Sequence, residues 1–153
     1  MHRLSLLLLP ALVAACQPMA APAASPPAAA PPSAPMAMAT GFPMATYTTT
    51  MVAADVPAGA PADMASQLVG SWTIAFGDNG HAMVSLNGRQ MVDAPFTVSG
   101  NVLTLTEDTG EYACHSTARY NWHATATELH LSKLEDACDG RAAVLTAHPL
   151  VRR

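Results

Sequence analysis

Five histidines in the second half of the chain are the first side chains to consider for chemistry: His81, His115, His123, His130 and His148. An imidazole can transfer a proton near neutral pH or bind a zinc or copper ion. The predicted strands place His123 and His130 on the outward face of one hairpin, where two imidazoles could hold such an ion weakly. A solvent-facing strand decorated with polar side chains explains them better, so we predict no metal and no cofactor.

The sequence lacks the short motifs that carry common catalytic chemistry. It contains no H-E-x-x-H, no G-x-S-x-G, no S-x-x-K and no glycine-rich phosphate loop. We therefore expect no catalytic residue and no enzyme activity. The net charge is −4, and lysine and arginine are scattered singly. Because nucleic-acid phosphates are neutralised by clustered basic side chains, we expect no nucleic-acid partner.

Two acidic residues, Asp136 and Asp139, flank the third cysteine, Cys138, with Arg141 close behind. Two carboxylates suggest calcium, but a hard cation needs six to eight oxygen ligands, and the chain offers no D-x-D-x-D-G loop. The alternative is local: the aspartate side chains cap a turn, and Arg141 pairs with one of them. We favour this structural role.

The N-terminal residues have the pattern of an export signal. His2 and Arg3 form a short positive segment, and Leu4–Leu9 is an apolar run. This run is too short to span a bilayer, which needs roughly 20 apolar residues. A signal peptide over residues 1–15 is therefore predicted.

The sequence Val-Ala-Ala-Cys at residues 13–16 resembles the lipobox of bacterial lipoproteins. The resemblance implies cleavage after Ala15 and acylation of Cys16, with chains such as palmitate holding the protein on a membrane. Two or more acyl chains anchor a protein stably, whereas one does not. Gln17 follows the cysteine, which in the Gram-negative sorting pattern implies the outer membrane of the cell envelope, facing the periplasm. An ordinary secretory signal with a chance cysteine is the alternative.

The cysteine count agrees with export. There are three cysteines, and acylation of Cys16 would leave Cys114 and Cys138 as the only intramolecular pair. In an oxidising compartment we expect a disulfide between them, which for a loop of about 24 residues adds roughly 3 to 4 kcal/mol of stability. A metal-binding pair is the alternative, but this spacing lacks the C-x-x-C element of zinc sites.

Composition divides the rest of the chain in two. Residues 16–44 are rich in alanine and proline, which cannot build a core, so a disordered tether is predicted there. Residues 45–153 suit one small domain with a single core.

This domain has the pattern of short strands. Residues 70–76 alternate strictly, with Trp72, Ile74 and Phe76 on one face. Asn-Gly pairs at 79–80 and 87–88 are typical hairpin turns. One short helix is predicted over residues 63–69, and Pro95 marks an edge or bulge in the strand over 91–98. The predicted strands are 46–52, 70–76, 82–86, 91–98, 102–106, 119–123, 128–132 and a last one over Arg141–Ala147.

The hairpin between residues 119 and 132 has a predicted register. We expect Trp122 to pair with Leu129 and Tyr120 with Leu131, because this places all four side chains on one face. Extended outwards, the register sets Cys114 opposite residue 137, next to Cys138. The disulfide would then close the base of the hairpin.

About eight short strands with regular turns indicate an all-β sandwich or a closed antiparallel meander barrel, and we favour the barrel. The short helix leading into Gly70-Ser71-Trp72 resembles the G-x-W opening of lipocalins and the wider calycin group. That resemblance implies a late arginine packed across the tryptophan, a part that Arg141 or Arg152 could play. The group also includes periplasmic protease inhibitors.

Two functions remain open, and the filling of the barrel separates them. An eight-stranded barrel can enclose its own side chains or one small ligand. Interior candidates are Trp72, Phe76, Tyr120 and Trp122. A filled core predicts a non-catalytic interaction module, in which the barrel loops bind a protein partner as a protease inhibitor does. A hollow barrel predicts lipocalin-like binding of a small apolar ligand. We favour the filled core because the inward-facing residues include many large side chains.

Overall fold

The computed structural model describes residues 41–153. The predicted signal peptide, Cys16 and the tether up to residue 40 lie outside the described residues. The strands are β1 (Thr46–Met51), β2 (Gly70–Phe76), β3 (His81–Leu86), β4 (Arg89–Ser99), β5 (Val102–Leu105), β6 (Thr109–Gly110), β7 (Ala118–Ala124), β8 (Glu128–Glu135) and β9 (Leu150–Arg152). The helices are the 3-10 helix η1 (Ala53–Asp55), α1 (Ala62–Leu68) and α2 (Asp139–Thr146).

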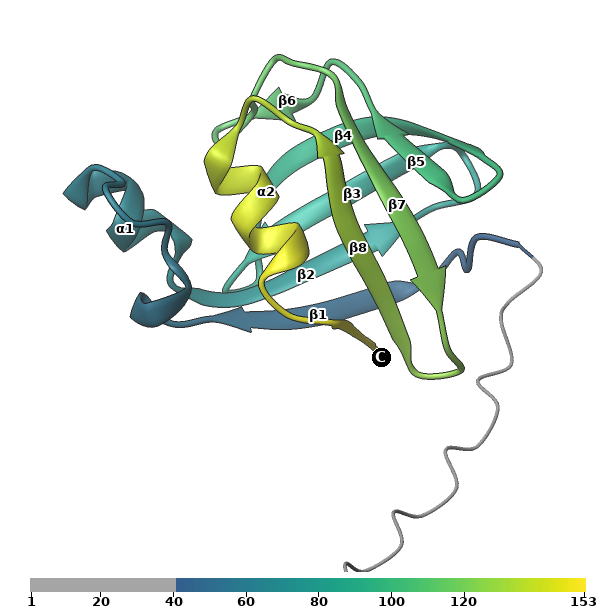
Figure 1. Ribbon diagram of the computed structural model, residues 1–153, viewed down its shortest axis with the longest axis horizontal. Coiled ribbons are helices and arrows are strands. Elements are labelled where there is room, and N and C mark those ends of the chain that lie inside the picture. Colours follow the sequence, from purple (N-terminus) through teal and green to yellow (C-terminus); the bar gives the residue numbers. More distant parts are fainter. Residues whose placement is uncertain (1–40) are drawn as a thin grey trace, which may run out of the picture. The chain divides into compact units, whose positions relative to one another are not determined.

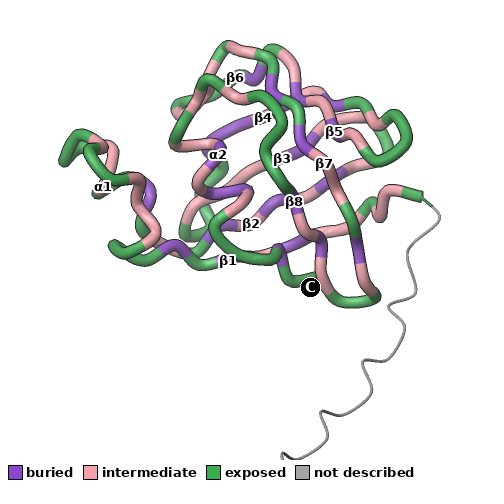
Figure 2. The backbone as a smooth tube through the Cα atoms, viewed as in Figure 1, coloured by how far each residue is buried: buried purple, intermediate pink, exposed green. Residues whose placement is uncertain are grey.

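The strands form a closed antiparallel barrel, as predicted. Their order is β3-β2-β1-β9-β8-β7-β5-β4, and β4 pairs back with β3, so eight strands complete the ring. The two-residue strand β6 pairs only with the first half of β4. Figure 1 shows the strands wrapping around a common interior, and the tube in Figure 2 is buried at alternating positions along several of them. Closure leaves the eight ring strands without a long free edge.

The predicted alternation of apolar and polar residues determines which side chains of β2 face the interior of the barrel. Trp72, Ile74 and Phe76 on β2 are buried, and the residues between them are more exposed. The Asn87-Gly88 turn joins β3 to β4, and both residues have positive φ, 50° and 83°, as a type I′ hairpin turn requires. The sequence therefore determines both which face of these strands is buried and where the chain reverses.

Pro95 lies inside β4, at the point where this long strand changes partner. Val92 and Asp93 pair with β6, whereas residues 96–99 pair with β5. Proline has no N–H to donate, so it fits where one side of the ladder is interrupted. The prediction of an edge or bulge position for Pro95 matches this local change of partner.

The predicted last strand over Arg141–Ala147 is wrong. Residues up to Thr146 belong to α2, Ala147 caps that helix, and the eighth strand of the ring is β9, which follows it. The helix buries Ala142, Val144 and Leu145. A strand would place the neighbours Val144 and Leu145 on opposite faces, whereas in a helix Ala142 and Leu145, three apart, share one face. Alanine also has the highest helix propensity.

The predicted register of the β7–β8 hairpin is also wrong, by two residues. Trp122 lies opposite Leu131, and Leu129 lies opposite Ala124. The turn lies further along the chain than expected, because the backbone N–H of Thr125 donates to the carbonyl of Glu128 at 2.9 Å. The Thr125 hydroxyl accepts from the N–H of Glu128 at 3.0 Å and so supplies the turn chemistry. A bulge between Arg119 and Tyr120 shifts the register again.

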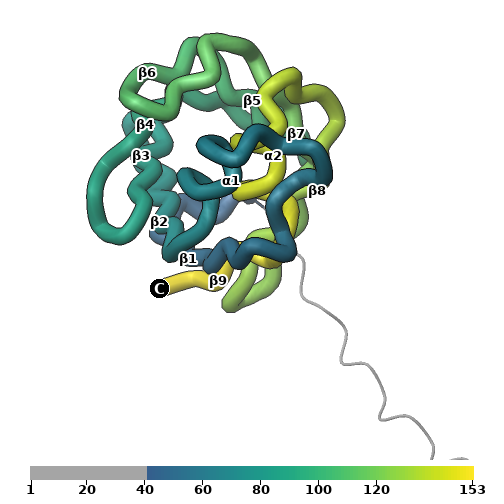
Figure 3. The backbone as a smooth tube through the Cα atoms, turned by 90° about the vertical axis from the view of Figure 1, so that its left-hand side faces the viewer, coloured from purple at the N-terminus to yellow at the C-terminus, as the bar shows by residue number. Residues whose placement is uncertain are grey.

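Both ends of the barrel are covered. In Figures 1 and 3, α1 and α2 lie across one end of the ring of strands. At the other end the segment before β1 folds inward: the Phe42 ring packs against Phe76, Phe96 and Trp122, with centroid distances of 5.0, 5.9 and 5.3 Å. The chain therefore packs with the barrel from about Phe42, slightly before the predicted domain start at residue 45.

Within residues 41–153, no helix has the length and apolar character needed to cross a membrane.

Candidate functional site

The barrel interior contains the four side chains that the sequence placed there. Trp72, Phe76 and Tyr120 are buried, and Trp122 is partly buried against the same core. They do not converge on one space. Trp72 lies toward the helical end, where its Nε1 donates to the carbonyl of Leu68 at 2.8 Å, whereas Phe76 and Trp122 contact Phe42 at the other end. The interior is therefore a packed core rather than a lined cup.

A small cavity lies inside the barrel. It has a volume of about 60 Å³ and lies against Trp72, Phe76, Tyr112 and Arg141, among other mostly apolar residues. An apolar cavity of about 150 Å³ can admit benzene, and drug-sized ligands occupy pockets of roughly 300 to 1,000 Å³. The interior as it stands is too small for a fatty acid or a similar apolar molecule.

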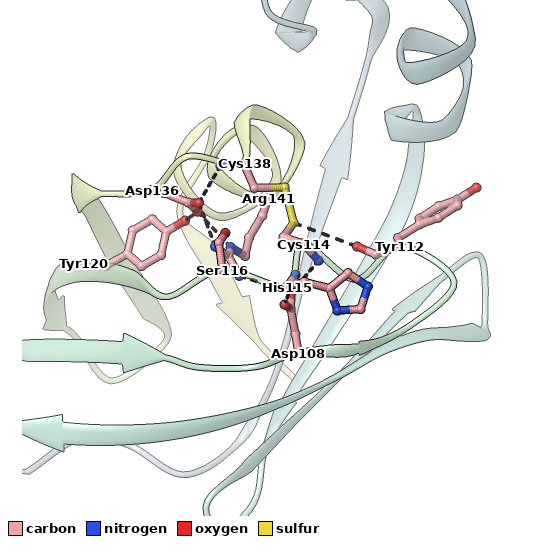
Figure 4. Close-up of a disulfide and its surroundings, with 9 residues drawn as sticks. All are labelled: Asp108, Tyr112, Cys114, His115, Ser116, Tyr120, Asp136, Cys138 and Arg141. Carbon is pink, nitrogen blue, oxygen red and sulfur yellow. Dashed lines mark hydrogen bonds and ion pairs between the residues drawn. A yellow bond between two sulfur atoms is a disulfide. The ribbon is translucent and has the colours of Figure 1, made fainter.

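A buried ion cluster closes the barrel at the helical end (Figure 4). Arg141, at the start of α2, donates from Nε to one Asp136 oxygen at 2.9 Å and from Nη2 to the other at 2.7 Å. Its Nη1 donates to Asp108 at 3.1 Å, and Nη2 also donates to the Ser116 hydroxyl. The Arg141 side chain is only 9% exposed. The expected pairing of Arg141 with a nearby aspartate is confirmed.

The protonation of this cluster follows from its contacts. Burial alone would raise the pKa of Asp136, but hydrogen bonds from Arg141, Tyr120 and the Cys138 N–H outweigh it and hold the pKa below its ordinary value. Burial and the hydrogen bond to Asp136 raise the pKa of Tyr120. The cluster is therefore one guanidinium between two buried carboxylates, Asp108 and Asp136, with a neutral phenol beside it. It forms a structural lock between α2 and the loop before β7.

The same cluster explains why Arg141 is not a lipocalin-type arginine stacked on Trp72. Arg141 borders the small cavity together with Trp72, but its guanidinium donors go to Asp108, Asp136 and Ser116. Arg152, the other candidate, is an exposed residue on β9 and pairs with Tyr47 of β1.

Cys114 and Cys138 form the predicted disulfide, with their Cα atoms 6.0 Å apart. Asp108, with 2% of its surface exposed, organises the loop that carries Cys114. It accepts hydrogen bonds from the backbone N–H groups of Cys114 at 3.1 Å and His115 at 2.9 Å, while its charge is neutralised by Arg141. The disulfide and the ion cluster thus fix the same two chain segments.

Sequence reasoning did not identify Asp108 or the link from Tyr120 to Asp136. Its partner Arg141 lies 33 positions away, so no local pattern marks Asp108. The available signal was weak. Aspartates that accept hydrogen bonds from nearby backbone N–H groups are common in polar loops, here from residues six and seven positions later, and only the tertiary fold brings Arg141 to Asp108.

A groove on the outer surface lies beside this lock. Its volume is about 540 Å³, and it is formed by α1, the loop before β7 and the start of α2. Met64, Leu68 and Tyr112 give it an apolar floor, and Glu111 and Asp139 add carboxylates. The one basic residue among its lining residues is Arg141, which is already neutralised by Asp108 and Asp136.

The structure brings His123 and His130 together as expected. They lie directly opposite each other on β7 and β8, with ring centroids 4.4 Å apart and planes 11° from parallel. Elsewhere His81 pairs with Asp93 and His148 with Asp55. Among residues 41–153, no three histidine, cysteine, aspartate or glutamate side chains are already arranged to hold a metal ion.

These features define a small antiparallel barrel with a filled interior and both ends covered. A disulfide holds the loops at one end. Compared with known proteins, the chain matches no family model, no curated protein and no solved structure.

Proposed function

We propose that this protein is a lipid-anchored envelope protein whose barrel is a non-catalytic interaction module. The observation that carries the proposal is the filled interior. A barrel with both ends covered and only about 60 Å³ of internal space presents its loops, and not its interior, to other molecules. Binding of a small apolar ligand, the alternative function, would require the core to open.

The groove beside α1 is the surface that best suits a protein partner. It combines apolar side chains with carboxylates, and three separate chain segments build it. A partner segment that carries an apolar side chain next to a lysine or arginine would complement both properties. Inhibition of a protease, as in the calycin inhibitors, is one form that such an interaction could take.

The lipobox supports the anchoring part of this proposal. Acylated Cys16 and the residues up to 40 would link the barrel to the membrane of the envelope, so that the loop end can reach partners near that surface. We expect Cys16→Ser to move the protein from the membrane fraction to the soluble fraction while its barrel stays folded. Equal membrane association of parent and variant would refute the lipid anchor.

The interaction itself can be tested with a photo-crosslinking side chain placed at Gln67, which is exposed on α1 at the groove. The same substitution at Thr97, exposed on β4, is the matched control. In the native host we expect a discrete crosslinked protein from position 67 and none from position 97. Crosslinking at neither position, together with a stoichiometric apolar small molecule in native mass spectra, would favour the ligand-binding alternative instead.

A further inference from the structure

The stacked pair of His123 and His130 is a second feature that could bind a ligand, and it lies on the wall of the barrel. The two residues are opposite partners in the β7–β8 ladder, so their side chains project from the same outer face. Their rings face each other at 4.4 Å. His123 is exposed, and the His130 side chain retains 29% of its surface, so an ion from solvent can reach both rings.

Glu128 orients one of these rings. Its Oε2 lies 3.1 Å from Nε2 of His130, two residues along the same face of β8. When His130 is neutral, this contact requires Nε2 to carry the proton, which leaves Nδ1 with a free lone pair. A histidine that donates its other ring N–H to a carboxylate is the usual arrangement around a bound metal, where the carboxylate fixes the tautomer and makes the ligating nitrogen more basic.

The other histidines with contacts to carboxylates differ in one respect. His81 contacts Asp93 at 2.8 Å and His148 contacts Asp55 at 2.9 Å, but in neither pair is a second imidazole stacked on the first. They therefore serve as natural controls, because each has a carboxylate-oriented ring without the neighbouring donor. Only the β7–β8 pair, among these three, combines an oriented ring with a second nitrogen ligand.

We propose that His123 and His130 form a binding site for a divalent transition-metal ion, with Cu²⁺ bound most tightly, and that Glu128 is the positioning residue. Two imidazole nitrogens with water in the remaining positions suit the square-planar preference of Cu²⁺, which also stands highest in the Irving–Williams order. The donors are not preformed, so rotation of the exposed His123 ring must open the stack. Such a site is open and exchanges its ion readily. This inference does not depend on the proposed protein partner.

The test is a titration of the full mature chain with Cu²⁺, and separately with Zn²⁺, followed by calorimetry and electron paramagnetic resonance. We expect one Cu²⁺ per chain with hyperfine coupling to two nitrogens, and weaker Zn²⁺ binding. His123→Ala and His130→Ala should each lower the Cu²⁺ affinity at least about tenfold. His81→Ala and His148→Ala should leave it within about twofold. Equal losses from all four variants would overturn the proposal.

Glu128→Gln separates a positioning residue from a ligand. The variant should bind Cu²⁺ about tenfold more weakly but retain the two-nitrogen spectrum, since it removes the charge that orients His130 and not a coordinating atom. Glu135→Gln, at an exposed glutamate further along β8, is the matched control. A second measurement requires no variant. Bound Cu²⁺ should broaden the amide NMR signals around residues 123 and 130, and broadening centred on His81 or His148 would refute the assignment.

Discussion

Arg141 holds Asp136 with two parallel hydrogen bonds, from Nε and Nη2 to the two carboxylate oxygens at 2.9 and 2.7 Å. The contact joins the first turn of α2 to the end of β8, in a position where the Asp136 side chain is fully buried. A bidentate pair fixes orientation as well as distance. This contact, together with the hydrogen bond from Nη1 of the same guanidinium to Asp108, holds α2 against the end of the barrel.

Removing the guanidinium should therefore be costly. We predict that Arg141→Met lowers the free energy of unfolding by about 3 to 5 kcal/mol, because two buried carboxylates lose their counter-ion. Urea unfolding followed by tryptophan fluorescence measures the difference. Arg119→Met, at an exposed arginine on β7, is the matched control and should change stability by less than about 1 kcal/mol. Similar losses from both substitutions would show that the cluster does not lock the fold.

The same cluster predicts how stability depends on acid. The pKa of Asp136 is lowered in the folded state, so between its folded and unfolded values the unfolded chain binds more protons. The stabilisation is complete above the unfolded pKa of about 3.9 and is lost as the pH falls below it. In Asp136→Asn this part of the acid dependence should disappear. Unfolding curves from about pH 7 to about pH 2 test the claim, and parallel curves for parent and variant below about pH 4 would contradict it.

The disulfide should be fully formed and strongly stabilising. In Cys16→Ser protein, which removes the one cysteine outside the pair, thiol titration after denaturation should find no free thiol. Replacing Cys114 and Cys138 together by alanine should lower the free energy of unfolding by about 3 to 4 kcal/mol, as expected for a loop of this length. Two reactive thiols per chain, or an unchanged stability of the double variant, would contradict the bridge.

Phe42 should behave as a core residue although it lies in the segment assigned to the tether from sequence. Phe42→Ala removes an aromatic ring that contacts Phe76, Phe96 and Trp122, so we predict a loss of about 2 to 3 kcal/mol, less than for a fully buried ring. Met44→Ala is the control, since Met44 is 46% exposed and should cost little. Thermal unfolding of both variants makes the comparison. An equal effect would mean that Phe42 does not close the barrel.

Local patterns in the sequence were sufficient to predict most of the strands that form the wall of the barrel. Strict alternation in residues 70–76 and the Asn87-Gly88 turn act over a few positions, so the buried faces and chain reversals were predictable. The disulfide was predictable because acylation of Cys16 would leave one pair. The short range of these rules explains why the fold class was correct.

Long-range packing explains what could not be predicted. Val144 and Leu145 occur in a short sequence that allows a strand or a helix, and the helix is favoured because it buries Ala142 and Leu145 together against the end of the barrel. The β7–β8 register depended on a turn without glycine, at Thr125, which has no strong sequence signature. Asp108 gains its role from Arg141, and no local pattern links two residues 33 positions apart.

The pairing of β1 with β9 has a consequence for how the chain folds. Thr48 and Val151 are partners in this ladder although 103 residues separate them, and β9 is only three residues long. High contact order of this kind slows folding, because the entropy of ring closure is lost before the final contacts form. Because β9 lies between β1 and β8, the ring cannot close before residues 150–152 have been synthesised. Until then, β1 and β8 each keep an unpaired edge. If the chain is exported from its N-terminus, as the proposed signal peptide implies, we therefore expect the ring to close only after β9 has crossed the membrane.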